Sequence, residues 1–190
     1  MTITIPASPI HTRIRLTPQT AAAILESPYS FAQDAEQHDG ERWSLEVEYP
    51  MMEQKDGAPI VRAFTQAGRH DTFTFACGVP ARGTATTFVP NGGSGTNTLP
   101  LTGTISGTLK DGDMVSMSDG TNLRLYVVAA DVADGAASIP VWPKLRGTPG
   151  AAVAVGASAR GTFRLVEDGF PYDIITPILY DVLVKAVEAL

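Results

Sequence analysis

The tightest constraint on the fold is a regular alternation of apolar and polar residues at positions 43–49. Trp43, Leu45, Val47 and Tyr49 fall on one side, and a serine and two glutamates separate them. Successive side chains of a β-strand point to opposite faces, so a period of two places one set inside and the other in water. The segment therefore predicts a half-buried strand.

Two further segments show the same period. Residues 10–16 place Ile10, Ile14 and Leu16 on one side, with His11, Arg13 and Arg15 between them, and residues 72–77 alternate through Phe73, Phe75 and Cys77. Both are predicted strands. The polar segment 33–40 is predicted to be a turn-prone connection.

One short helix is predicted in the first half of the chain, at residues 58–67. Asp56 and Gly57 serve as its expected cap, Pro59 fits its first turn, and Gly68 is a terminator.

The amino-acid composition of the chain changes after residue 83 and changes back after about residue 160. The intervening segment is rich in Gly, Thr, Ala and Val and has few charges. Its short apolar runs, separated by Gly and Asp turn signals, predict a small barrel or sandwich, of which an OB-like barrel is the most economical form. The expected strands are residues 98–101, 114–117, 123–128, 138–142 and 152–155.

The last segment, residues 172–190, is ambiguous. Its apolar residues from Ile175 to Leu190 recur at helical spacing, and Glu188 falls on the polar side of that helix. Its density of isoleucine and valine favours a strand instead.

Composition excludes several functional classes. The net charge of -6, without a run of lysine or arginine, argues against a nucleic-acid partner. The amino terminus has no leader-like pattern and no stretch is apolar enough to span a membrane, so we expect a soluble protein without membrane insertion. The single cysteine, Cys77, cannot form an intramolecular disulfide, and its apolar neighbours predict a buried side chain.

No constellation of residues predicts catalysis, a cofactor or a metal. Asp111, Asp113 and Asp119 superficially resemble a cation loop, but the bidentate glutamate of such a loop is missing, so we interpret them as turns. His70 next to Asp71 is interpreted as a solvated turn. Trp142 is the one ligand-binding candidate, as a stacking platform for sugars, although aromatic residues in strands are more often core. We expect a protein that is not an enzyme.

The order of the segments resembles that of the distal tail proteins of long-tailed, non-contractile bacteriophages and prophages. The resemblance covers most of the chain and rests on short phrases in sequence order. These are residues 43–52, 64–68, 71–75, 109–113, 123–128, 141–146, 160–165 and 187–190. Gly57 and Pro59 depart from it by shortening the helix, and residues 21–25 have no counterpart.

The resemblance implies a mainly β fold: a β-sandwich with one short helix, carrying an inserted OB-like barrel. Residues 1–83 and 160–190 would form the discontinuous ring-forming domain, residues 84–159 would form the insert, and the terminal segment would be a strand. The implied function is that of a structural virion protein, made in the host cytoplasm and located in the tail. Its hexameric ring would join the tail tube protein to the hub proteins of the tail tip or baseplate.

Two other classes compete with this interpretation. A carbohydrate- or receptor-binding accessory tail module would bind glycans through aromatic platforms such as Trp142. A tail-tube or tail-completion protein would form stacked rings instead of one ring.

Overall fold

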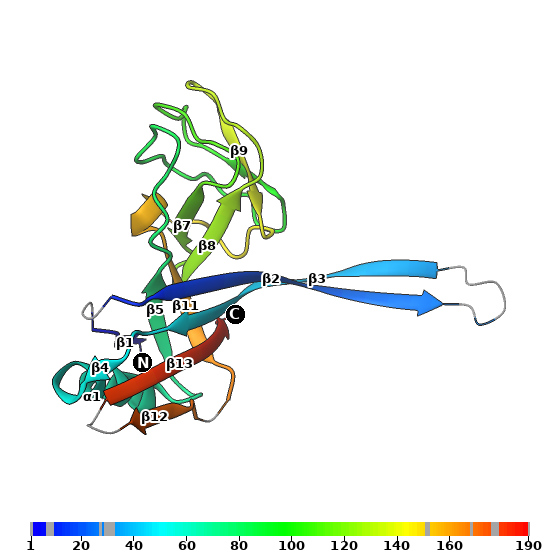
Figure 1. Ribbon diagram of the computed structural model, residues 1–190. Helices are drawn as coiled ribbons and strands as arrows, with labels where there is room; N and C mark the ends of the chain where they lie inside the picture. Colours follow the sequence, from blue (N-terminus) through cyan, green and yellow to red (C-terminus); the bar gives the residue numbers. More distant parts are fainter. Residues whose placement is uncertain are drawn as a thin grey trace.

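The computed structural model describes residues 2–6, 10–26, 28, 33–150, 153–167, 169–175 and 179–189, and for residues 22–25 and 33–39 it describes the backbone alone. The described chain is mainly β, with two sheets and one α-helix. A long two-stranded ribbon projects from the body to one side, and the smaller sheet stands above the larger one (Figure 1). No helix in this part of the chain has the length and apolar character required to cross a membrane.

The larger sheet has eight strands and combines both ends of the chain. Its main path runs β1-β5-β11-β13-β3-β2, and β4 and β12 also pair with β13. β1 lies parallel to β5, and the other pairs are antiparallel. The strands are β1 (Thr2–Thr4), β2 (Arg13–Glu26), β3 (Gln33–Glu48), β4 (Met52–Glu53), β5 (Thr72–Ala76), β11 (Arg160–Leu165), β12 (Tyr172–Ile175) and β13 (Leu179–Glu188).

The smaller sheet has five antiparallel strands in the order β10-β7-β8-β9-β6. They confirm the strands predicted in the central segment to within a residue or two, except that Ala152 lies outside the described residues. They are β6 (Thr98–Pro100), β7 (Met114–Ser118), β8 (Leu123–Val128), β9 (Ser138–Trp142) and β10 (Val153–Val155), followed by the short 3-10 helix η1 (Gly156–Ser158).

The buried apolar side chains form two clusters, and the one under the larger sheet also includes Met114 and Leu125 of the smaller sheet. Under the larger sheet Phe64 is fully buried, with its ring 5.2 Å from Phe73 and 5.6 Å from Phe170. The smaller sheet encloses a second cluster around Leu99 and Ile139. The strands of the smaller sheet thus all come from the central segment, and those of the larger sheet from the two ends of the chain, as the composition suggests. The division into domains at residues 83 and 160 stays a prediction.

The helix α1 (Gln54–Ala67) begins earlier than predicted. Its N-cap is Glu53, not Asp56 or Gly57, and Pro59 lies beyond the first turn. A Cβ on Gly57 would lie 2.6 Å from that of Tyr180, so the first turn packs closely on β13. This tertiary contact holds a turn that local propensity does not favour. The predicted terminator is confirmed, because Gly68 caps the helix with a φ of 49°.

Two strand predictions needed correction. Segment 33–40 is not a turn: it belongs to β3 and pairs along β2 as far as Gln33 with Glu26. Because this ribbon lies outside the body (Figure 1), its fold does not require one apolar face, and no alternation in the sequence marks it. Strand β2 begins at Arg13, and Ile10 is 75% exposed where burial was expected.

The terminal segment is a strand, against its helical spacing. Val182, Val184 and Ala186 are completely buried on one face of β13. The period of two places Glu188 on the same face. Thr176, Ile178 and Leu190, which belonged to the predicted helical pattern, lie outside the described residues.

Candidate functional site

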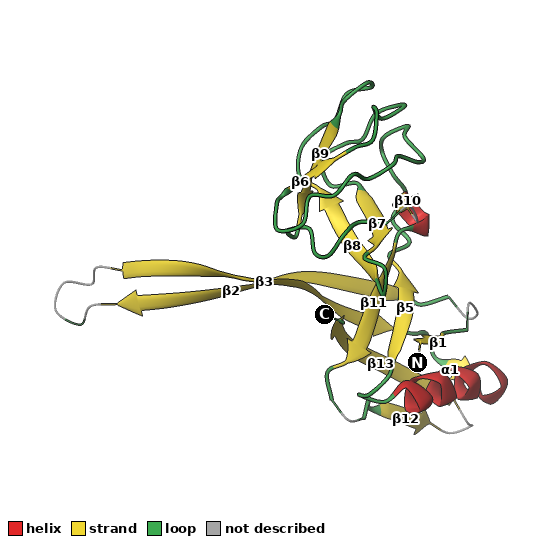
Figure 2. Ribbon diagram, turned by 180° about the vertical axis from the view of Figure 1, so that it is seen from behind, coloured by secondary structure: helices red, strands yellow, loops and turns green. Residues whose placement is uncertain are grey.

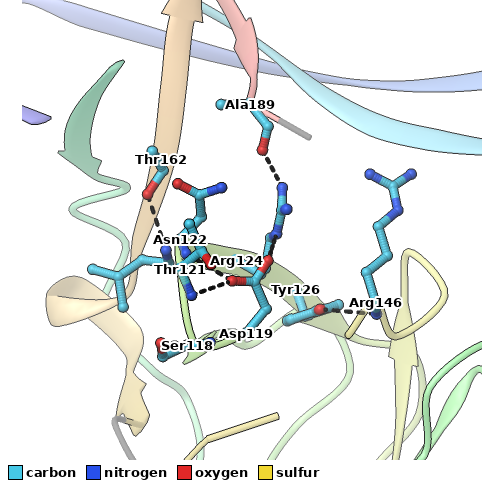
Figure 3. Close-up of polar contacts among 11 residues, drawn as sticks. Ser118, Asp119, Thr121, Asn122, Arg124, Tyr126, Arg146, Thr162 and Ala189 are labelled. Carbon is cyan, nitrogen blue, oxygen red and sulfur yellow. Dashed lines mark hydrogen bonds and ion pairs between the residues drawn. The ribbon is translucent and has the colours of Figure 1, made fainter. Parts of the chain in front are cut away.

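Four charged side chains lie near one another where the smaller sheet contacts the larger one, and Figure 3 labels three of them, Asp119, Arg124 and Arg146. We call Asp119, Arg124, Arg146 and Glu188 the junction cluster. The side chains of Asp119 and Arg124 are only 11% and 8% exposed, and Glu188 is 3% exposed. Buried charges are normally paired and hydrogen-bonded, as Asp119 and Arg124 are, whereas the buried Nη1 of Arg146 has no hydrogen-bond partner among the described residues.

Asp119 organises the turn that joins β7 to β8. One carboxylate oxygen accepts hydrogen bonds from the backbone N–H groups of Thr121 and Asn122, at 2.9 and 2.7 Å. The other accepts from Nε of Arg124 at 2.6 Å. Burial alone would raise the pKa of Asp119, but these donors outweigh it and the pKa lies below its usual value. An aspartate in this turn therefore remains charged and fixes the guanidinium.

The side chain of Arg124, on β8, reaches Ala189, the residue that follows β13 in the larger sheet. Its Nη1 donates to the carbonyl oxygen of Ala189, and the neighbouring N–H of Leu123 donates to Oγ1 of Thr162 on β11 at 2.9 Å. Figure 3 shows the two bonds side by side. The start of β8 is thereby bonded to β11 and to the residue that follows β13.

Glu188 belongs to the same cluster from the side of β13. Its Oε2 accepts from the backbone N–H of Trp43 at 3.3 Å. Burial raises the pKa of Glu188, although the Trp43 N–H and the guanidinium groups of Arg124 and Arg146 oppose this shift. Its charged form is thus less well stabilised than that of Asp119.

A second set of contacts holds the root of the projecting ribbon. The indole Nε1 of Trp43 donates to the carbonyl oxygen of Leu125 at 2.9 Å, and Oε2 of buried Glu41 accepts from the N–H of Lys144 at 2.8 Å. The ring of Trp142 stands edge-on to that of Trp43, with centroids 4.8 Å apart. The smaller sheet therefore packs against β3 and hydrogen-bonds to it where the ribbon leaves the body.

The predicted ligand candidates do not come together. Trp142 is half-buried against Trp43, and its indole is engaged in this packing. Asp113 is 2% exposed and accepts three backbone N–H bonds, from Arg82, Gly83 and Lys110, at 2.7 to 2.9 Å. It ties the connection after β5 to the smaller sheet. Asp111 is exposed, as expected of a turn, and its N–H donates to Asp131.

The other candidates from the sequence have structural positions. His70 is fully exposed beside Asp71, as a solvated turn predicts, and Cys77 is buried, which confirms that prediction. Within the described residues no group of three or more His, Cys, Asp or Glu side chains is arranged to hold a metal ion.

A cavity of about 250 Å³ lies at the edge of β5 beyond the end of β1. Its walls include His11, Tyr49, Phe75 and Arg160. The rings of His11 and Phe75 are 5.4 Å apart, and burial lowers the pKa of His11 and raises that of Tyr49 to about 12. Both groups are therefore neutral at physiological pH, which leaves Arg160 as the charged side chain of this wall.

The sequence does not point to the junction cluster, because the helical spacing of the last segment, one of its two open interpretations, places Glu188 on the polar side. Counting residues by two from Val182 would have placed it inside. No local signal marks Arg124 or Arg146, whose burial depends on the approach of the second sheet.

Neither a scan against models of protein families nor a search of curated proteins finds a match to this chain.

Glu188 provides a prediction about pH. A raised pKa in the folded state means that its contribution to stability is fully present below its unfolded pKa, near 4.5, and is lost as pH rises through the folded pKa. Glutamine keeps the acceptor for Trp43 but carries no buried charge. We expect the stability of Glu188→Gln relative to wild type to increase as pH rises above 4.5, measured by urea unfolding across a pH series. Glu46→Gln, on the wet face of β3, is the matched control and should show no such trend.

Proposed function

We propose that this chain is a structural protein of a bacteriophage or prophage virion tail. In this proposal it is a distal tail protein, whose hexameric ring joins the tail tube to the hub of the tip or baseplate. Its segment order resembles that family, and its chemistry is that of a scaffold: the buried charges bind one part of the protein to another. Its partners would be further copies of itself, the tube protein and the hub proteins.

The observation that carries the proposal is the projecting ribbon. Strand β13 covers β3 only from Ser44 to Glu48, whereas β2 and β3 continue as a two-stranded ribbon as far as Glu26 and Gln33. Figure 2 shows this ribbon extending well beyond the body. An isolated two-stranded ribbon is marginally stable in water, and its open edges invite pairing. Such an arm is suited to contact with a neighbouring subunit.

The finer fold belongs to the same proposal. Residues 1–83 with 160–190 would form the β-sandwich-like domain of the ring, and residues 84–159 a small OB-like barrel inserted into it. Two observations support this division: the strands of each sheet come from these segments, and a second apolar cluster consists of residues 85–145 alone. The contacts at the junction would hold the insert in a fixed orientation on the ring.

Labelling of virions tests the proposal. Antibodies against this chain, viewed by electron microscopy, should mark one position at the distal end of the tail. Label along the whole tube would favour the tail-tube alternative, and virions without the chain would refute a structural role. As a complement, native mass spectrometry of the purified chain should detect closed hexamers.

The carbohydrate-binding alternative makes an opposite prediction for Trp142. Because this ring packs on Trp43, we expect Trp142→Ala to lower the free energy of unfolding by about 2–3 kcal/mol. Trp142→Phe, which keeps an aromatic ring in the contact, should lose less. Chemical denaturation measures the change, and a glycan array measures binding. Saturable glycan binding by wild type that Trp142→Ala abolishes without loss of stability would support a sugar site instead.

A further inference from the structure

Strand β12 is an exposed edge with an apolar surface. In the described part of the chain it pairs with β13 alone, and all four of its residues are exposed. Tyr172, Ile174 and Ile175 are 44%, 59% and 40% exposed. A strand edge with exposed apolar side chains and unpaired backbone groups is a template for another strand, and soluble proteins normally protect such edges.

Two carboxylates on this edge lack a counter-ion. Asp173 of β12 stands directly opposite Asp181 of β13, so their side chains leave the same face of the sheet as neighbours. Like charges in this position repel each other. Neither residue has an ion-pair partner among the residues that the structure describes. A cation supplied by a partner would relieve the repulsion.

The opposite edge of the larger sheet offers the complementary pattern. The outer side of β2 is unpaired in the described structure, and it begins with exposed Arg13 and Arg15 separated by half-buried Ile14. Ile10, just before the strand, is 75% exposed. Arg15 lies 4.0 Å from Glu46, whereas Arg13 has no ion pair within the described ranges.

The register places the two sets of charges on one face. Arg13 pairs with Glu48, and Glu48 pairs with Leu183 of β13. Asp181 lies two residues before Leu183 and therefore shares its face, as does Asp173 opposite it. Two copies joined edge to edge, β2 beside β12, would align arginines with aspartates on one face. The apolar side chains of the two strands would meet on the other.

We infer that β2 of one copy adds to β12 of the next and that this strand pairing is one of the contacts between subunits of the ring, in addition to the contact made by the projecting ribbon. The inference rests on the proposed ring. Because β2 ends the main path of the sheet and β12 branches from β13 on the side away from β3, the contact joins two different edges and is head-to-tail, the kind that closes into a cyclic ring when the rotation per subunit allows it. The partner that fits β12 is thus a second copy of this chain.

Cross-linking tests the contact without removing its charges. Thr17→Cys on β2 and Ile175→Cys on β12 are treated with a short bismaleimide; wild type, whose Cys77 is buried, is the background control. A mixture of the two single variants should give cross-linked dimers, and the double variant a ladder of higher multimers. Each single variant alone should remain uncross-linked. Absence of product in the mixture, or self-linking of either single variant, overturns the inference.

Charge reversal provides the second measurement. Arg13→Asp and Asp173→Arg should each raise the dissociation constant between subunits about tenfold or more, and the double variant should recover most of the loss. Asp173→Arg faces Asp181 within its own subunit, so weakened assembly would not reflect a damaged fold. Arg62→Asp, on the exposed side of α1, is the matched control.

The outcomes separate this inference from the function. Rings that form with wild-type affinity in both reversed variants would refute the strand pairing and leave the ring intact. A wild type that neither assembles nor cross-links would also refute the pairing, while labelling of virions decides the tail role independently.

Discussion

Replacing Arg124 with alanine is expected to lower the free energy of unfolding by about 3–5 kcal/mol. The guanidinium contacts Asp119 at 2.6 Å and the carbonyl of Ala189, and all these groups are buried or nearly so. Removing it leaves the Asp119 carboxylate in the interior without its counter-ion. That desolvation cost, more than the lost attraction, makes the effect large.

Urea unfolding followed by tryptophan fluorescence measures this change. The two tryptophans of the chain, Trp43 and Trp142, both lie beside the junction and report on it directly. Lys110→Ala is the matched control, because it removes another short ion pair, 2.8 Å to Asp131, between exposed side chains. We expect that control to change stability little, since solvent screens the pair. A loss for Arg124→Ala as small as that of the control would contradict the structural role of the junction cluster.

A second variant examines the cause of the loss. In an Asp119→Asn background the carboxylate is neutral, so removal of Arg124 no longer leaves that charge unpaired. We expect Arg124→Ala to cost clearly less in this background than in wild type, which a double-mutant cycle measures. Equal costs in both backgrounds would show that the loss comes from packing of the arginine stem.

Truncation of the ribbon is expected to abolish assembly while preserving the fold of the subunit. Replacing residues 21–40 with Asn-Gly joins Thr20 to Glu41, which already pair across the ribbon, through a two-residue hairpin turn. Glu41 and Trp43, which contact the smaller sheet, are retained. The removed part has no third strand beside it in the described structure, so little of the body's core is lost.

Native mass spectrometry and urea unfolding together evaluate the truncation. The expected result is a monomer whose free energy of unfolding stays within about 1 kcal/mol of wild type, as for changes away from buried contacts. Truncated subunits that still form rings would show that the arm is dispensable for assembly. A truncated chain that fails to fold would show instead that the arm supports its own subunit. The full-length chain with Thr20→Ser serves as the control.

The candidate site shows where sequence reasoning reaches its limit. Burial of Trp43, Leu45 and Val47 follows from their own spacing, because a strand with one face inside must alternate. The burial of Glu188 also follows once β13 is known to be a strand. The role of Arg124 does not, because its neighbours Ala189 and Asp119 are determined by how the second sheet rests on the first.

Local residue patterns were enough to predict the mainly β class and the strands of the central segment. They also predicted the buried faces of β3 and β5 and the end of the helix at Gly68. These are local properties: the strands follow from the alternation of apolar and polar residues, and the helix end follows from a glycine, which tolerates positive φ. Three features could be seen only in the three-dimensional structure. Residues 33–40 extend a strand, the helix begins at Gln54, and Trp142 packs on Trp43. Each of these depends on a partner in another element: the adjacent strand β2 for the ribbon, Tyr180 for the first helical turn and β3 for the indole. Such contacts leave no period in the chain, because their free energy comes from pairing and packing between segments.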